Sequence, residues 1–85
     1  MTWRVEFRPA ARAELLKLDR PVQARVLRSL HRLAADPRSA SNVKALTGGD
    51  EYRLRVGDWR VVFTLHDDVL TVLVVRIAHR GDVYR

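Results

Sequence analysis

The segment YRLRVGDWRVVF, residues 52–63, decides the central part of the fold. On each side of Gly57 and Asp58, apolar residues alternate with other residues, which is typical of strands with one buried face. A two-residue Gly-Asp loop favours a β-hairpin because glycine accepts the positive φ that such a turn requires. We therefore predict two antiparallel strands over residues 51–56 and 59–66.

The predicted register separates two faces of this hairpin. Arg55 lies opposite Arg60, and Arg53 shares their side, which we call the arginine face. The other face is apolar and should form the core: Tyr52, Leu54, Val56, Trp59, Val61 and Phe63. Directly opposed arginines should cost a few tenths to about 1 kcal/mol of sheet stability. We therefore interpret the arginine face as an anion site, the alternative being that its arginines extend into water or pair with Glu51 or Asp58.

The remaining segments complete an α+β fold. TWRVEFR (residues 2–8) alternates like a strand, and helical stripes follow on both sides of the break at Asp19–Pro21. Residues 37–50 are predicted to be a loop, and residues 69–78 a last strand. In that strand Leu70, Val72 and Val74 should face the core, whereas Thr71, Leu73, Val75 and Ile77 should join the arginine face. The predicted order is β-α-α-β-β-β, an antiparallel sheet with a helical hairpin packed on one face.

Composition limits the class of protein. With 85 residues, we expect a single domain over residues 1–85. The net charge of +6 indicates an anionic partner, such as nucleic acid, an acidic protein or a membrane surface. The lack of cysteine excludes disulfides and thiolate chemistry. No apolar run is long enough for a membrane helix and no signal peptide is visible, so we expect a cytoplasmic protein.

The second predicted helix carries a basic stripe. Arg25, Arg28 and Arg32 lie opposite its apolar residues. A basic stripe is most often a solvated face, and the alternative is contact with RNA phosphates or an acidic partner. We retain the three arginines as candidate RNA-binding residues.

The end of the chain adds groups suited to phosphodiester chemistry. His79 offers an imidazole, Arg80 offers another guanidinium fork, and Tyr84 offers a phenol and a ring. Beside the arginine face, they suggest cleavage of RNA by its own 2′-hydroxyl group. Metal-dependent nucleases use clustered carboxylates and histidines, but the adjacent His66, Asp67 and Asp68 lie in an apparent hairpin turn, far from the other histidines in sequence. We therefore expect neither a metal nor another cofactor.

The segments YRLRVGDWRVVF and HRGDVYR, preceded by a strand and a helical hairpin, resemble the RelE/ParE superfamily of bacterial type II toxins. The RelE branch of that superfamily cleaves mRNA on the ribosome without a metal, and the ParE branch inhibits DNA gyrase. The resemblance implies a phosphate-binding role for Arg60, leaving-group assistance by Arg80 and substrate orientation by Tyr84. Because Arg80 and Tyr84 match the RelE branch, we expect an mRNA endoribonuclease, with gyrase inhibition as the alternative.

The resemblance also bears on the general base and on the partners. Arg53 and Arg55 occupy positions where relatives often carry lysine, one of which acts as the base. Arginine stays protonated, so either His79 or Glu51 takes that role, or the activity is weak. The resemblance further implies binding to a cognate antitoxin in a hetero-oligomer, and to mRNA and the ribosome.

Overall fold

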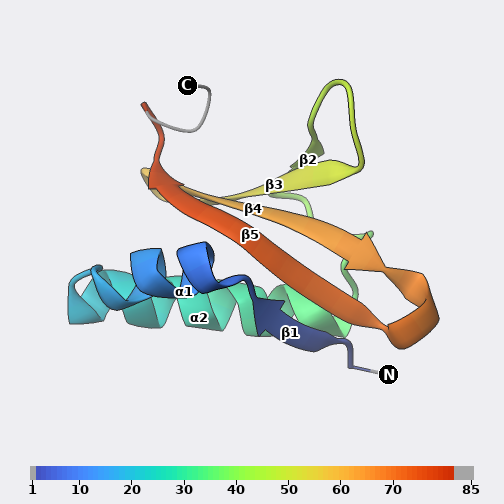
Figure 1. Ribbon diagram of the computed structural model, residues 1–85, viewed down its shortest axis with the longest axis horizontal. Helices are drawn as coiled ribbons and strands as arrows, with labels where there is room; N and C mark the ends of the chain where they lie inside the picture. The colour runs from blue at the N-terminus through green and yellow to red at the C-terminus, as the bar shows by residue number, and fades with distance from the viewer. Residues whose placement is uncertain (1, 82–85) are drawn as a thin grey trace.

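The computed structural model describes residues 2–81, which form a five-stranded sheet with two helices on one face (Figure 1). The elements are β1 (Arg4–Phe7), α1 (Pro9–Leu16), α2 (Arg20–Ala35), β2 (Val43–Ala45), β3 (Glu51–Val56), β4 (Trp59–His66), the 3-10 turn η1 (Asp67–Val69) and β5 (Thr71–His79). The strands lie in the order β1-β5-β4-β3-β2. The predicted α+β class is confirmed.

Each helix begins at a proline and buries one apolar stripe. Pro9 and Pro21 stand in the first turns of α1 and α2, where the missing N–H group has no intrahelical partner to lose. The buried stripes contact the inner face of β3, β4 and β5, and this core includes Ala11, Leu15, Val26, Leu30, Leu33, Leu54, Val61, Phe63, Val72 and Val74. Within residues 2–81, no helix combines the length and apolar character needed to cross a bilayer.

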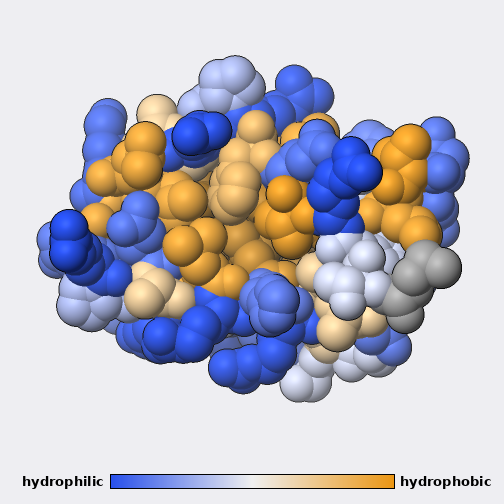
Figure 2. Space-filling view, turned by 90° about the horizontal axis from the view of Figure 1, so that it is seen from below, coloured by the Kyte–Doolittle hydropathy of each residue, from blue (hydrophilic) through white to orange (hydrophobic). Residues whose placement is uncertain are grey.

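The outer side of the helices is less apolar than the side that packs on the sheet. Seen from that side, orange apolar residues are broken up by blue hydrophilic ones (Figure 2). Leu16 of α1 is 66% exposed and Leu27 of α2 is 43% exposed. The arginine face lies on the other side of the sheet, away from both helices.

The β3–β4 hairpin has the predicted register in full. Arg55 pairs with Arg60 and Val56 with Trp59, on either side of Gly57–Asp58. Gly57 has a φ of +59°, which meets the requirement of the tight turn. The hairpin's apolar face packs in the core as predicted, and the rings of Tyr52 and Phe63 stack at 5.5 Å. Pairing and burial thus agree with the alternation in the sequence.

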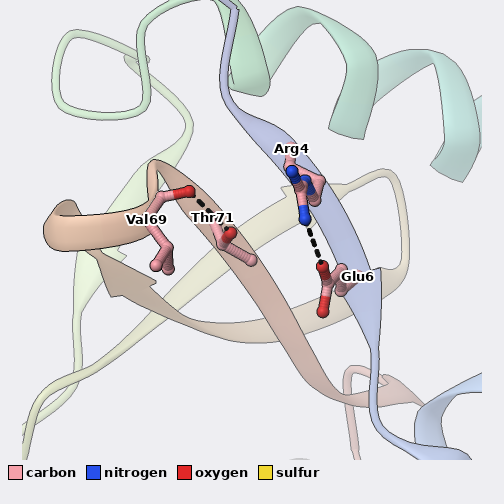
Figure 3. A network of polar contacts seen from close by, with 4 residues as sticks. All are labelled: Arg4, Glu6, Val69 and Thr71. Atoms are coloured by element: carbon pink, nitrogen blue, oxygen red, sulfur yellow. Dashed lines mark hydrogen bonds and ion pairs between the residues drawn. The ribbon is translucent and has the colours of Figure 1, made fainter.

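The β1 edge departs from the antiparallel pattern. The sheet is mostly antiparallel, but β1 runs parallel to β5, from the pair Arg4↔Thr71 to the pair Phe7↔Val74. Alternation defines the faces of a strand and not its direction, so the sequence pattern gave no sign of this pairing. Figure 3 shows this edge, where Thr71 Oγ1 donates a 3.0 Å hydrogen bond to the Val69 carbonyl oxygen. On β1, Arg4 Nη1 lies 3.5 Å from Glu6 Oε2.

The expected loop over residues 37–50 contains a short strand, so this expectation is wrong at Val43–Ala45. These three residues form β2 and pair antiparallel with β3. A strand of three residues is too short to display a period of two, and its pairing partner defines it. Val43 packs against the core.

Candidate functional site

The arginine face is built from adjacent strands. Arg53 and Arg55 of β3 lie beside Val62 and Arg60 of β4. Directly paired residues project to the same side of a sheet, so these side chains share one surface. Arg55 is exposed, whereas Arg53 and Arg60 are half-buried. The central prediction, that the three arginines lie together opposite the core, is confirmed.

A β-bulge changes which side chains of β5 reach this surface. Phe63 pairs with Val74, but Val62 pairs with Arg76, which leaves Val75 as an extra residue. Beyond the bulge the faces are therefore exchanged relative to simple alternation. Ile77 is 2% exposed and belongs to the core, so its predicted place on the arginine face is wrong. Ala78 pairs with Arg60 instead.

The beginning of β5 also differs from the prediction. Leu70 was expected as a buried strand residue, but it precedes β5 and is only half-buried. Its φ of +46° marks the turn that follows η1. Thr71 pairs with His66 on the side of the sheet that carries the arginine face, as expected, and its hydroxyl group is tied to the Val69 carbonyl oxygen. The turn therefore delays the strand by two residues.

Arg60 is the fixed centre of the arginine face. Its Nη1 donates hydrogen bonds to the carbonyl oxygens of Gly57, at 2.8 Å, and Trp59, at 3.0 Å. Burial lowers the pKa of Arg60, and the nearby charges of Arg53, Arg55 and Arg80 lower it further, while Asp58 opposes them. The charged form of Arg60 is thus disfavoured by its surroundings, and a bound anion would relieve that cost.

Arg80 joins this group through the β3–β4 turn. Its backbone N–H donates to the Asp58 carbonyl oxygen at 2.8 Å, just beyond the end of β5. Its guanidinium Nη1 lies 3.9 Å from Asp58 Oδ1, and both side chains are largely exposed, so this ion pair adds little stability. The turn therefore holds Arg80 near Arg60 while leaving its guanidinium accessible.

The structure does not bring His79 together with the arginines. His79 pairs with Trp59, on the helix-facing side, and the two rings meet edge to face at 5.5 Å. There it lines a groove of about 490 Å³ with Glu14 and Leu18 of the helical region. The bulge at Val75 is the physical reason, since it turns His79 away from the arginine face. The predicted Tyr84 lies outside the described residues.

Two side chains extend the arginine face toward β2. Lys44 pairs with Arg53, and Glu51 lies on the same side of β3 as Arg53. The three residues line a cavity of about 380 Å³. Lys44 was not among the predicted site residues because β2 was not predicted, although it is one of two lysines in a chain otherwise rich in arginine. Glu51 was considered as a base, and the structure places it on the appropriate face.

The basic stripe of α2 lies elsewhere. Arg25, Arg28 and Arg32 are exposed on α2, away from the arginine face proper. Together with Arg55 at the end of β3, these three residues line a separate cleft. The sequence-predicted arginines therefore form two neighbouring groups.

Comparison with known proteins identifies the family. The family described as "ParE toxin of type II toxin-antitoxin system, parDE" matches residues 5–84. The chain belongs to this toxin family. Toxin RelG of Mycobacterium tuberculosis is 28% identical over 86 residues, covering 100% of this chain and 99% of RelG. The predicted membership of the RelE/ParE superfamily is confirmed.

Solved structures of RelE/ParE toxins share the fold. The toxin–antitoxin complex RelBE2 from Mycobacterium tuberculosis contains a chain that matches with a TM-score of 0.84 and 27% identity, covering 96% of this chain and 95% of that chain. The archaeal RelE–RelB complex from Pyrococcus horikoshii gives a TM-score of 0.82 and 26% identity, covering 98% and 100%. The toxin fold is therefore present over nearly the whole described chain.

Proposed function

We propose that this chain is the toxin of a type II toxin–antitoxin pair and cleaves mRNA on the ribosome, without a metal ion or cofactor, in the cytoplasm. The observation that carries the proposal is the gathering of Arg53, Arg55 and Arg80 near Arg60. Cationic donors held in place before reaction stabilise the charge that develops on a phosphate during cleavage. Toxins with RelE names among the relatives add support.

The proposed reaction uses the RNA's own nucleophile. A 2′-hydroxyl oxygen attacks the adjacent phosphorus, a cyclic phosphate forms, and the bond to the 5′-oxygen of the next nucleotide breaks. A base receives the hydroxyl proton, and the leaving oxygen receives a proton in turn. In this scheme Arg55 and Arg60 bind the phosphate oxygens, Arg80 assists the leaving oxygen, and Tyr84 orients the substrate.

Glu51 is the proposed general base. It shares the arginine face, whereas His79 packs on Trp59 at the opposite side of the sheet. A carboxylate accepts a proton readily, and the always-protonated guanidiniums of Arg53 and Arg55 do not. The open position of Glu51 beside Arg53 allows it to approach a bound ribose.

A short pulse of expression tests the proposal. We expect growth arrest and new mRNA 5′ ends within codons, mapped by sequencing of RNA ends. Arg60→Ala should lower the cleavage rate by about 100-fold to 1,000-fold, because it removes a preorganised cationic donor. Arg60→Lys should restore only part of the rate, since one ammonium cannot replace a guanidinium fork.

Folding provides the control for this test. The Arg60→Ala protein should keep its circular dichroism spectrum, because the Arg60 side chain lies outside the hydrophobic core. Growth arrest with intact mRNA, or full cleavage by folded Arg60→Ala protein, would contradict the nuclease proposal.

Gyrase inhibition is the second candidate. The matching family carries the ParE name, and the helices present exposed Leu16 and Leu27 as a possible contact surface. This alternative predicts a DNA-damage response, intact mRNA and unchanged toxicity of Arg80→Ala. The same expression pulse therefore distinguishes the two targets.

The proposed partner outside the ribosome is an antitoxin protein. Similar folds occur in RelB–RelE complexes, and the net charge of +6 suits an acidic segment. We propose that this segment covers the arginine face and thereby blocks access of RNA. The resulting complex would be a hetero-oligomer of toxin and antitoxin.

A further inference from the structure

A second cationic site lies between α2 and the β3–β4 turn. Arg25, Arg28 and Arg32 follow helical spacing, so they project from one side of α2. Together with Arg55 they line a cleft of about 230 Å³, which we call the α2 cleft. Its remaining lining residues are Ser29, Val56 and Gly57.

Gly57 contacts one arginine of the α2 cleft and one arginine of the arginine face. A Cβ atom added at Gly57 would lie 2.8 Å from Arg25 Nη2, so the Arg25 guanidinium is seated directly against the turn. The carbonyl oxygen of the same glycine accepts the 2.8 Å hydrogen bond from Arg60 Nη1. One turn therefore holds a guanidinium from each of the two sites.

Among the residues that the structure describes, no acidic residue lines the α2 cleft. Every residue that lines it is neutral or cationic. Within residues 2–81, the ion pairs involve Arg4, Arg38, Arg76 and Arg80, and none of the four cleft arginines. Four cationic residues that line one cleft repel one another, so an anion bound among them would offset this repulsion.

The lining favours a phosphate over an acidic peptide. Arginine forks match the geometry of phosphate oxygens, and Ser29 adds a hydroxyl group. A docked protein segment normally needs apolar anchors, but Val56 is the cleft's one apolar side chain and is only 6% exposed. A sugar–phosphate backbone needs no such anchor.

We propose that the α2 cleft is a second phosphate-binding site, which holds the RNA backbone at a phosphate other than the one cleaved. Arg55 lines this cleft and is also paired with Arg60. A single RNA strand or a neighbouring RNA segment therefore passes from the arginine face over the Gly57 turn onto α2. The inference rests on the proposed function in one respect, namely that the ligand is RNA.

Salt-dependent binding of an uncleavable RNA tests this inference. The probe is a fluorescein-labelled 2′-O-methyl RNA oligonucleotide, whose binding to the full chain is followed by anisotropy from low to moderate salt. For Arg28→Ala/Arg32→Ala we expect about tenfold weaker binding at low salt, and a log–log salt slope smaller by roughly 1.4, because two phosphate contacts are lost.

A matched variant controls for net charge. Arg12→Ala/Arg20→Ala removes the same charge from exposed helical positions outside the cleft. The cleft variant should lower the logarithm of the binding constant by about one. The control should lower it by less than half of that amount. Equal losses for both pairs would overturn the inference, since they would indicate a general charge effect. Thermal melting should confirm that both variants remain folded.

Further outcomes separate this inference from its alternatives. If the cleft variant binds RNA normally but loses affinity for a poly-glutamate peptide, the cleft contacts an acidic protein and the inference is overturned. Because the probe cannot be cleaved, its binding does not depend on nuclease activity. Cleft-dependent binding by a chain that leaves mRNA intact would support this inference and contradict the nuclease proposal alone.

Discussion

Arg60 and Glu51 differ in how firmly the hairpin holds them. Two backbone carbonyl oxygens fix the Arg60 guanidinium, at 2.8 Å and 3.0 Å, before any ligand arrives. Glu51 stands two residues from Arg53 at the start of β3 and is exposed. Arg60 thus resembles a preorganised binding group, and Glu51 is free to follow a substrate.

Glu51→Gln tests the proton-transfer role. The amide keeps the shape of the side chain but cannot take a proton, so we expect the cleavage rate to fall by about 100-fold. The rate is measured on programmed ribosomes. His79→Ala is the comparison, and its rate should change by no more than a few fold, because its ring packs on Trp59. The reverse ranking would reassign the base to His79.

At the scale of elements, the β3–β4 hairpin and the bulge in β5 assemble the site. The hairpin sets Arg55 opposite Arg60, and its turn accepts hydrogen bonds from Arg60 and Arg80. The bulge at Val75 then exchanges the faces of the last part of β5. Without it, alternation from Val74 would have put Ile77 and His79 among the arginines.

Gly57→Ala tests the turn. The φ of +59° is unfavourable for alanine, and the new methyl group would displace the Arg25 guanidinium. We expect a loss of about 1 kcal/mol in the free energy of unfolding, measured by urea denaturation. Gly57→Asn is the comparison, because asparagine tolerates this backbone conformation better than alanine does. An Ala variant as stable as the original protein would show that the turn adjusts freely.

At the scale of the whole molecule, the residues that stabilise the fold and the proposed catalytic residues lie on opposite faces of the sheet. One face and the two helices form the core, and the other face carries the cations, so the two tasks compete little (Figure 1). An 85-residue domain has roughly 4–13 kcal/mol of stability, which leaves a small margin for core defects. Substitutions in the core should therefore act through folding and those on the arginine face through activity.

Leu30→Ala tests this separation. Leu30 is 1% exposed in the core, so truncation should destabilise the fold by about 2–5 kcal/mol, measured by urea denaturation. Toxicity on expression should fall in parallel, although no arginine is changed. Leu27→Ala on the same helix is the control, and its 43% exposure predicts a much smaller loss of stability. Comparable losses for both variants would contradict the assigned core.

Sequence alone was sufficient for the local features of this protein. The alternation of residues 51–63 and the Gly57–Asp58 turn specified the hairpin register, because a two-residue loop leaves one pairing that keeps the apolar face together. The same pattern placed Arg53, Arg55 and Arg60 on one surface. The helical stripes likewise indicated which residues of α2 would be buried.

Tertiary structure decided the features that depend on distant segments. The parallel pairing of β1 with β5, the short strand β2 and the bulge at Val75 each arise from contacts with a partner strand, which a single segment does not encode. The bulge moved His79 away from the arginines, and β2 brought Lys44 to them. The approach of Arg25 to Gly57 required α2 to pack across the hairpin. Periodicity reports which side of a segment is buried, and the packed chain alone determines which segments meet.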